Sequence, residues 1–211
     1  MKLYSFSFAP NARRVTAFLN EKGIEVDTYE LNVREGEQFK EPYQTMNPFN
    51  CVPFLKLDNG LVISESLSIC RYLENLHPDP SLFGDSPEKI SYIDMWNRRL
   101  ELNALAALGQ AVRNKLPFFE GKVLAGTRND IKQSPEIVNR ARDILNDFCE
   151  RVNPHLKDKS FICGSDFTVA DITGYFIFPA CDALDFKIDS KYENVLKWKD
   201  TISNRDCFKF D

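Results

Sequence analysis

Residues 52–66 read Val-Pro-Phe-Leu-Lys-Leu-Asp-Asn-Gly-Leu-Val-Ile-Ser-Glu-Ser, and this stretch decides the fold. Two short apolar runs, 54–57 and 61–63, flank an Asp-Asn-Gly sequence at 58–60. Asparagine and glycine adopt positive φ at low cost, so this pattern predicts a β-hairpin. Pro53 cannot donate to a strand ladder and therefore belongs at the start of the first strand. The Val52-Pro53 bond is also of the type that adopts the cis form.

The end of the same stretch predicts a binding site. Ser64, Glu65 and Ser66 close the second strand and open a helix whose apolar stripe contains Ile69 and Leu73. A helix start presents free backbone N–H groups and the positive end of the helix dipole, which suit a carboxylate. The Glu65 carboxylate beside it suits an ammonium group. The implied ligand is a molecule with both ends of an amino-acid zwitterion.

Working outward, the first half of the chain predicts the element order β-α-β-α-β-β-α. This is the order of a thioredoxin-like domain, whose hairpin demands a mixed sheet. Arg13 and Arg14 are expected to be surface charges of the first helix. The predicted elements are a strand at 2–6, a helix from Pro10 to the Gly23 terminator, a strand at 24–31, a short irregular helix at 35–46, the hairpin, and a helix at 65–77.

The second half of the chain reads as helical throughout. A proline-rich break after His77 predicts a linker at 78–86 between a first domain at 1–77 and a helical domain at 87–211. The fold class is therefore an α/β thioredoxin-like N-terminal domain plus an all-α C-terminal domain. A long helix is expected from Pro87 to about Lys115. Thr168 and Asp171 have the spacing of a capping box that opens a central helix.

Composition limits the function classes. The 211 residues carry a net charge of −4, which disfavours a nucleic-acid surface, and no apolar run approaches the ~20 residues of a membrane span. The six cysteines form no Cys-x-x-Cys pair and the two histidines stand apart, so we expect no metal site. The N-terminus shows no signal-peptide pattern. We expect a cytoplasmic protein with free thiols.

Val52-Pro53, the hairpin, Glu65-Ser66 and the Thr168/Asp171 cap, in this order, resemble the glutathione transferase superfamily of the cytosolic type. The resemblance covers nearly the whole chain. It implies that the backbone of the residue before the proline pairs with the cysteinyl part of glutathione, and that the Glu-Ser pair holds the γ-glutamyl end. It further implies glutathione as co-substrate, a small hydrophobic electrophile as second substrate, and a homodimer.

The group that activates the thiol departs from the family pattern. Family members place a Tyr, Ser or Cys between the first strand and first helix, but no cysteine precedes Cys51, and the serine positions hold Phe8 and Ala9. The candidate catalytic residues are therefore the Ser7 hydroxyl and the Asn11 amide. The Ala-Pro-Asn-x-Arg-Arg run at 9–14 resembles a bacterial-type subgroup, and several positions resemble the glutathione contacts of nu-class transferases, which also reduce disulfides. The predicted glutathione-binding residues are Asn11, Gln38, Val52, Pro53, Glu65 and Ser66.

Three functions remain open at this point. The first is a glutathione transferase that attacks an apolar electrophile, the second a glutathione-dependent reductase of disulfides or peroxides. The third is a non-catalytic binding or regulatory member of the fold, like the stringent starvation proteins. The missing hydroxyl at Ala9 favours the last two, whereas the retained Glu65-Ser66 pair disfavours the third. A maleylacetoacetate isomerase is not expected, because the Ser-Ser-Cys segment of that class is absent. The residues predicted to line the electrophile pocket are Phe8, Arg99, Asn103, Ala107, Arg113 and Tyr175.

Overall fold

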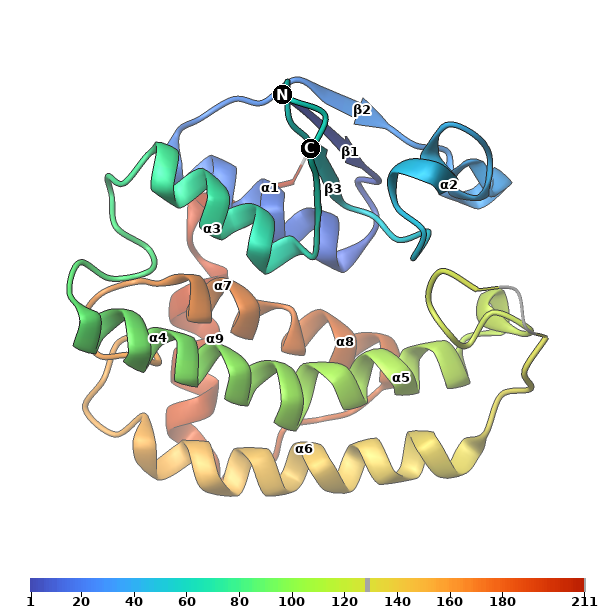
Figure 1. The fold of residues 1–211 in the computed structure, drawn as a ribbon. Helices are drawn as coiled ribbons and strands as arrows, with labels where there is room; N and C mark the ends of the chain where they lie inside the picture. Colours follow the sequence, from blue (N-terminus) through green and yellow to red (C-terminus); the bar gives the residue numbers. More distant parts are fainter. Residues whose placement is uncertain (128–129, 211) are drawn as a thin grey trace. The chain divides into compact units, whose positions relative to one another are not determined.

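The computed structural model of the protein describes residues 1–127 and 130–210 (Figure 1). The chain divides into two compact units. Within the described residues, the first unit comprises 1–80, 125–127 and 206–210, and the second comprises 81–124 and 130–205. Three positions of the helical domain predicted at 87–211, namely 128, 129 and 211, lie outside the described residues.

The first unit is built on a mixed four-stranded sheet of order β2-β1-β3-β4. Its strands are β1 (Lys2–Ser5), β2 (Thr28–Glu30), β3 (Phe54–Lys56) and β4 (Val62–Ser64). β1 pairs parallel with β2 and antiparallel with β3, and the predicted hairpin is the antiparallel β3–β4 pair. Gly60 has a φ of 87°, as the hairpin turn requires. The thioredoxin-like arrangement is confirmed, although β2 is shorter than the strand expected at 24–31, since it pairs only along the short β1.

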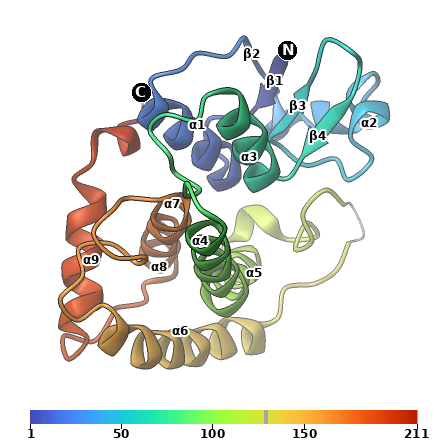
Figure 2. The ribbon, with the colours of Figure 1, turned by 60° about the vertical axis from the view of Figure 1, so that its left-hand side comes forward.

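Helices α1 (Pro10–Lys22) and α3 (Ser66–Leu76) pack side by side in this unit (Figure 2). The segment between β2 and β3 forms η1 (Val33–Glu35), η2 (Glu37–Phe39) and α2 (Tyr43–Met46) in place of one irregular helix. Two later segments also belong to this unit. Asn50 Nδ2 donates to the Gly126 carbonyl (3.3 Å), and Asn20 Nδ2 donates to the carbonyl of Cys207 in η5 (Asp206–Phe208; 3.2 Å).

Buried charges join α1 to α3. The Lys22 ammonium lies 2.6 Å from a Glu74 carboxylate oxygen and donates to the His77 carbonyl at 2.7 Å. Arg14 is only 3% exposed, so the expectation that it lies on the helix surface is wrong. The reason is tertiary, because Arg14 faces α3 and its guanidinium donates to Ser66. A charge buried between two helices must be matched by polar partners, which fixes how the helices meet.

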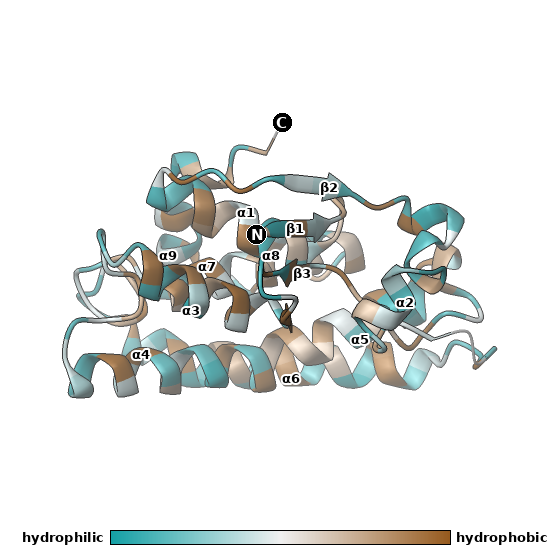
Figure 3. Cartoon of the chain, turned by 45° about the horizontal axis from the view of Figure 1, so that its top comes forward, coloured by the Kyte–Doolittle hydropathy of each residue, from teal (hydrophilic) through white to brown (hydrophobic). Residues whose placement is uncertain are grey.

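The second unit is helical. The long helix predicted from Pro87 is present, but Glu101–Leu105 forms a π turn, η3, between α4 and α5. Figure 3 shows hydrophobic and hydrophilic residues alternating along α4, as an amphipathic helix requires. The helices are α4 (Pro87–Leu100), α5 (Ala106–Lys115), η4 (Pro117–Phe119), α6 (Pro135–His155), α7 (Val169–Tyr175), α8 (Ile177–Leu184) and α9 (Glu193–Ser203). α6 packs along α5, and both views show the two helices side by side (Figures 1 and 2).

A single buried carboxylate lies at the start of α7, where the predicted capping box is confirmed. Asp171 is fully buried and accepts hydrogen bonds from the Ile162 amide (2.8 Å), the Thr168 amide and hydroxyl (both 3.0 Å) and Trp198 Nε1 (2.9 Å). Burial raises the pKa of the Asp171 carboxyl to about 6, while these donors oppose the rise. One carboxylate thus ties α7 to α9 and to the preceding loop.

Candidate functional site

The peptide bond between Val52 and Pro53 is cis, and it lies where the chain enters β3. The ladder of β3 begins at Phe54, so the backbone groups of Val52 stand outside the sheet pairing. Asn47 Nδ2 donates to the Cys51 carbonyl (2.8 Å) and holds the turn that leads into the bond. The backbone of Val52 is therefore presented at the end of the sheet by a fixed turn.

Glu65 and Ser66 stand at the start of α3, where the helix has no side-chain cap from the described residues. Glu65 has a φ of 71° and a ψ of 116°, a conformation that costs a non-glycine residue ~1–3 kcal/mol and that clusters at ligand sites. Its side chain is exposed, whereas Ser66 is buried. The Ser66 hydroxyl oxygen accepts from Arg14 Nη1 at 3.3 Å, so its own hydrogen remains available to a ligand. An uncapped helix start, a buried guanidinium and an exposed carboxylate suit the two ends of a zwitterion.

Gln38, in η2, is buried at 6% exposure. Its Oε1 has no hydrogen-bond partner within residues 1–127 and 130–210. Buried amide groups are nearly always hydrogen-bonded, so an orphaned acceptor calls for a partner that the chain itself does not supply. A donor on a bound molecule, such as a peptide N–H, would satisfy it.

The start of α1 is uncapped as well. Its N-cap residue, Ala9, has no side chain that reaches the helix, and Pro10 follows at the first helical position. Asn11 lies exposed in the first turn. By contrast, α4 is capped by Ser86 and α7 by Thr168. The first turn of α1 therefore keeps free amides that favour a nearby anion.

Ser7 is engaged elsewhere. Its amide and its hydroxyl both donate to Oε1 of Glu30, at 2.7 and 2.8 Å, and its carbonyl accepts from Arg13 Nε at 2.7 Å. A hydroxyl has one hydrogen to donate, so in this arrangement the Ser7 hydroxyl does not donate to any other group. The two candidate catalytic residues thus differ, because Asn11 faces solvent and Ser7 is held by Glu30.

The residues predicted for the electrophile pocket are distributed over both units. Phe8 belongs to the first unit and is 62% exposed. The others, Arg99, Asn103, Ala107, Arg113 and Tyr175, belong to the second unit. The Arg99 guanidinium lies over the Trp96 ring, and Asn103 donates to the Arg99 carbonyl at 3.0 Å. Ala107 is half-buried, Arg113 donates to the Lys122 carbonyl at 2.9 Å, and Tyr175 lies at the end of α7. The pocket that they would form stays a prediction.

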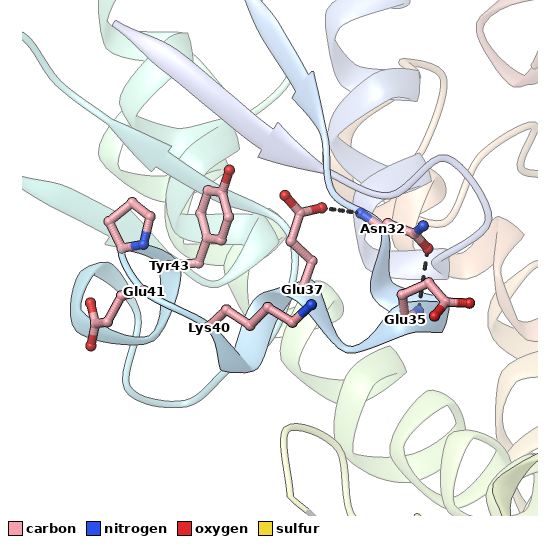
Figure 4. Close-up of a pocket in the computed structure, with 7 residues that line it drawn as sticks. Asn32, Glu35, Glu37, Lys40, Glu41 and Tyr43 are labelled. Carbon is pink, nitrogen blue, oxygen red and sulfur yellow. Dashed lines mark hydrogen bonds between the residues drawn. The ribbon is translucent and has the colours of Figure 1, made fainter.

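A surface pocket of about 430 Å³ lies on the segment from β2 to α2 (Figure 4). Its lining residues are Asn32, Glu35, Glu37, Lys40, Glu41, Pro42 and Tyr43. Glu37 is fixed there by the Asn32 amide (2.6 Å) and the Tyr29 hydroxyl (2.9 Å), and the Asn32 amide is the main cause that lowers its pKa. The predicted glutathione residues do not line this pocket, so we do not assign the ligand to it.

Four of the six thiols are poorly suited to act as nucleophiles. Burial raises the pKa of the Cys70, Cys149, Cys163 and Cys181 thiols to about 12, which makes these thiols poor nucleophiles. Among the described residues, no cluster of three His, Cys, Asp or Glu side chains has the arrangement to hold a metal ion. No helix in the described part of the chain is both long and apolar enough to cross a membrane.

Sequence reasoning missed two residues of this site, Arg14 and Glu30. Arg14 is one of two adjacent arginines in the first helix, and nothing in the local sequence distinguishes it from the half-buried Arg13. Glu30 ends a strand, and only the parallel pairing of β1 with β2 brings it beside Ser7. The parallel register was the one available signal, since the carboxyl ends of parallel strands meet at the same edge.

Comparison with known proteins identifies the family of the chain. Residues 3–81 match the family model "Glutathione S-transferase, N-terminal domain" and residues 116–206 match "Glutathione S-transferase, C-terminal domain". The chain is 30% identical over 200 residues to a glutathione S-transferase of Drosophila melanogaster, covering 94% of this chain and 82% of the relative. It is 39% identical over 196 residues to the maleylacetoacetate isomerase of Mus musculus, covering 92% and 83%.

Among solved structures, Gtt2 from Saccharomyces cerevisiae superposes with a TM-score of 0.87 at 26% identity, covering 99% of each chain. These matches span both units. The chain therefore belongs to the glutathione S-transferase family.

Proposed function

We propose that the protein is a glutathione transferase that ionises the thiol of glutathione for attack on a small hydrophobic electrophile. The observation that carries the proposal is the start of α3, where strained Glu65, buried Ser66 and buried Arg14 meet. In this proposal Glu65 takes the ammonium of the γ-glutamyl end, and Ser66 with the helix start takes its carboxylate. Val52, preceding Pro53, pairs by its backbone with the cysteinyl part, and Gln38 accepts from a ligand amide.

Asn11 is proposed to face the sulfur. A free thiol with a pKa near ~8.5 must fall by about two units to be mostly ionised at neutral pH, which requires ~2.7 kcal/mol. A helix start contributes roughly 0.3–1 kcal/mol, and a hydrogen bond to a charged group about 1.5–3 kcal/mol. One amide donor at the uncapped start of α1 is therefore sufficient, without a side-chain base. Ser7 is less suited, since its hydroxyl donates to Glu30.

The wider setting follows from the family and stays part of the proposal. The electrophile would bind at the predicted pocket of Phe8, Arg99, Asn103, Ala107, Arg113 and Tyr175. The protein is proposed to act as a homodimer in the cytoplasm, in detoxification. The likeness of the glutathione residues to those of the nu class is likewise a proposal.

Activity assays with purified protein test this function. Conjugation of glutathione to a dinitrophenyl halide should be measurable above the uncatalysed rate, and Glu65→Ala should lower it at subsaturating glutathione. The exposed Glu25→Ala variant serves as the control. Turnover of a small organic disulfide or hydroperoxide with no conjugation would move the assignment to the reductase.

A second function is favoured by one specific observation. The identity of 39% to the Mus musculus maleylacetoacetate isomerase exceeds that to the Drosophila melanogaster transferase. Glutathione-dependent isomerisation of maleylacetoacetate is therefore the second candidate, although the Ser-Ser-Cys segment expected of that class is absent. Loss of maleylacetoacetate absorbance that requires both glutathione and this protein would favour it over the transferase.

A further inference from the structure

The loop between β1 and α1 is held by side chains that the proposed reaction does not use. Ser7, at the centre of this loop, offers three hydrogen-bonding groups: amide, hydroxyl and carbonyl. The first two donate to Glu30 Oε1 at 2.7 and 2.8 Å, and the third accepts from Arg13 Nε at 2.7 Å. A surface serine whose every polar group is engaged by a charged partner belongs to a fixed loop.

The aromatic neighbour in the loop is held as well. The Phe8 ring has the Arg34 guanidinium 5.0 Å from its centroid and that of Arg13 at 6.0 Å. Arg13 also lies 5.0 Å from the ring centroid of Phe210, near the end of the chain. The same arginine thus fixes the loop backbone and stacks on both rings.

Glu30 reaches this loop through the topology of the sheet. In the parallel β1–β2 pair, Glu30 is opposite Ser5, and the Leu31 amide donates to the Ser5 carbonyl at 2.8 Å. The loops that leave both strands therefore start at one edge of the sheet, and Glu30 lies two residues away from Ser7 in register. From there the chain passes through Ala9 into the uncapped first turn of α1.

We propose that Glu30 is a positioning residue for thiol activation, which fixes the Ser7 loop and thereby the first turn of α1 against the glutathione sulfur. This inference rests on the proposed function. In this proposal Glu30 acts through Ser7, whose amide and hydroxyl both donate to its Oε1, and not by contact with the thiol. A Glu30 carboxylate facing the sulfur would oppose ionisation of the thiol. Glu30 therefore favours the thiolate only by fixing the Ser7 loop.

The test is the pKa of glutathione thiol in the complex, read from thiolate absorbance against pH at saturating glutathione. Glu30→Ala should raise this pKa by about 0.5–1 unit and lower kcat several-fold, while Kd for glutathione from calorimetry stays within about twofold. Glu30→Gln, which keeps an acceptor oxygen at the same place, should remain near wild type. Ser7→Ala, which keeps the amide contact, should give a smaller rise, and Arg13→Ala a rise in the same direction.

Two results would overturn the inference. The first is an unchanged pKa in a folded Glu30→Ala variant. The second is a thiol pKa that falls in Glu30→Ala, with the fall absent from the Ser7→Ala/Glu30→Ala double variant. In that case Ser7 is the sulfur donor, and Glu30 competes with the sulfur for the hydrogen of the Ser7 hydroxyl. Melting temperatures establish that each variant is folded. Failure of the wild type to bind glutathione at all would overturn the proposed function together with this inference, whereas binding with a thiol pKa independent of Glu30 overturns only the inference.

Discussion

Replacing Asp171 with alanine removes an acceptor that serves four donors. Three of these are N–H groups of residues with buried side chains: the Ile162 and Thr168 amides and Trp198 Nε1. A buried donor left without a partner costs about 1–3 kcal/mol, so Asp171→Ala should lower the free energy of unfolding by at least about 3 kcal/mol. For a chain of this size that corresponds to a fall in Tm of roughly 6–12 °C.

Thermal unfolding followed by circular dichroism measures this fall, with Asp166→Ala as the matched control. Asp166 is exposed, lies five residues earlier and accepts a hydrogen bond from the Ser165 hydroxyl at 3.3 Å. Its loss should therefore shift Tm by no more than about 2 °C. The KM for glutathione should stay near wild type in Asp171→Ala, since Asp171 belongs to the second unit and the proposed glutathione residues to the first. A Tm for Asp171→Ala equal to that of the control would refute the argument that these donors depend on one carboxylate.

Other predictions address charge and binding. Burial raises the pKa of Asp171 to about 6 from 3.8, so the stability that its protonation gives the folded state is full below about pH 4 and is lost as the pH rises through 6. The free energy of unfolding of the wild type, relative to that of Asp171→Asn, should therefore fall by about 3 kcal/mol between pH 4 and 7. A difference that stays flat or rises with pH would contradict this sign. Glu65→Ala should weaken glutathione binding at least about tenfold, ~1.4 kcal/mol, by calorimetry, with Glu25→Ala unchanged. Asn11→Ala should raise the pKa of bound glutathione thiol by about one unit or more, and an unchanged value would remove Asn11 from the sulfur site. Lys22→Ala should lower the free energy of unfolding by more than about 2 kcal/mol, since Lys22 pairs with Glu74 inside the first unit. Chemical denaturation at neutral pH measures this loss, and a denaturation midpoint equal to that of the wild type would contradict it.

The features predicted correctly from sequence are those that neighbouring residues determine. Gly60 specifies a turn through its own backbone freedom, and Asn59 supports the turn because its Oδ1 accepts from the Leu61 amide. Pro53 specifies a strand start through its missing N–H hydrogen. Thr168 and Asp171 satisfy each other across one helical turn. Each of these signals is complete within a few residues, so it does not depend on how distant segments meet.

The features that were missed depend on contacts between distant segments. Arg14 is buried because α1 meets α3 at Ser66, 52 positions further along the chain. Glu30 reaches Ser7 because two strands pair in parallel. Residues 206–210 belong to the first unit, although 125 residues lie between them and Pro80 in the sequence. The π turn at Glu101–Leu105 was also missed, since it interrupts a pattern that predicts one continuous helix. Local propensity does not encode such contacts, and they are where the candidate site gains Arg14 and Glu30.

The measurement that tests the central claim most directly is isothermal titration of glutathione into the wild-type protein at neutral pH. The start of α3, with Glu65, Ser66 and Arg14, predicts saturable binding in the micromolar-to-millimolar range, and thiolate absorbance in the same complex should give a thiol pKa about two units below the free value near ~8.5. Absence of binding at millimolar glutathione would contradict the account and leave a non-catalytic binding module in its place.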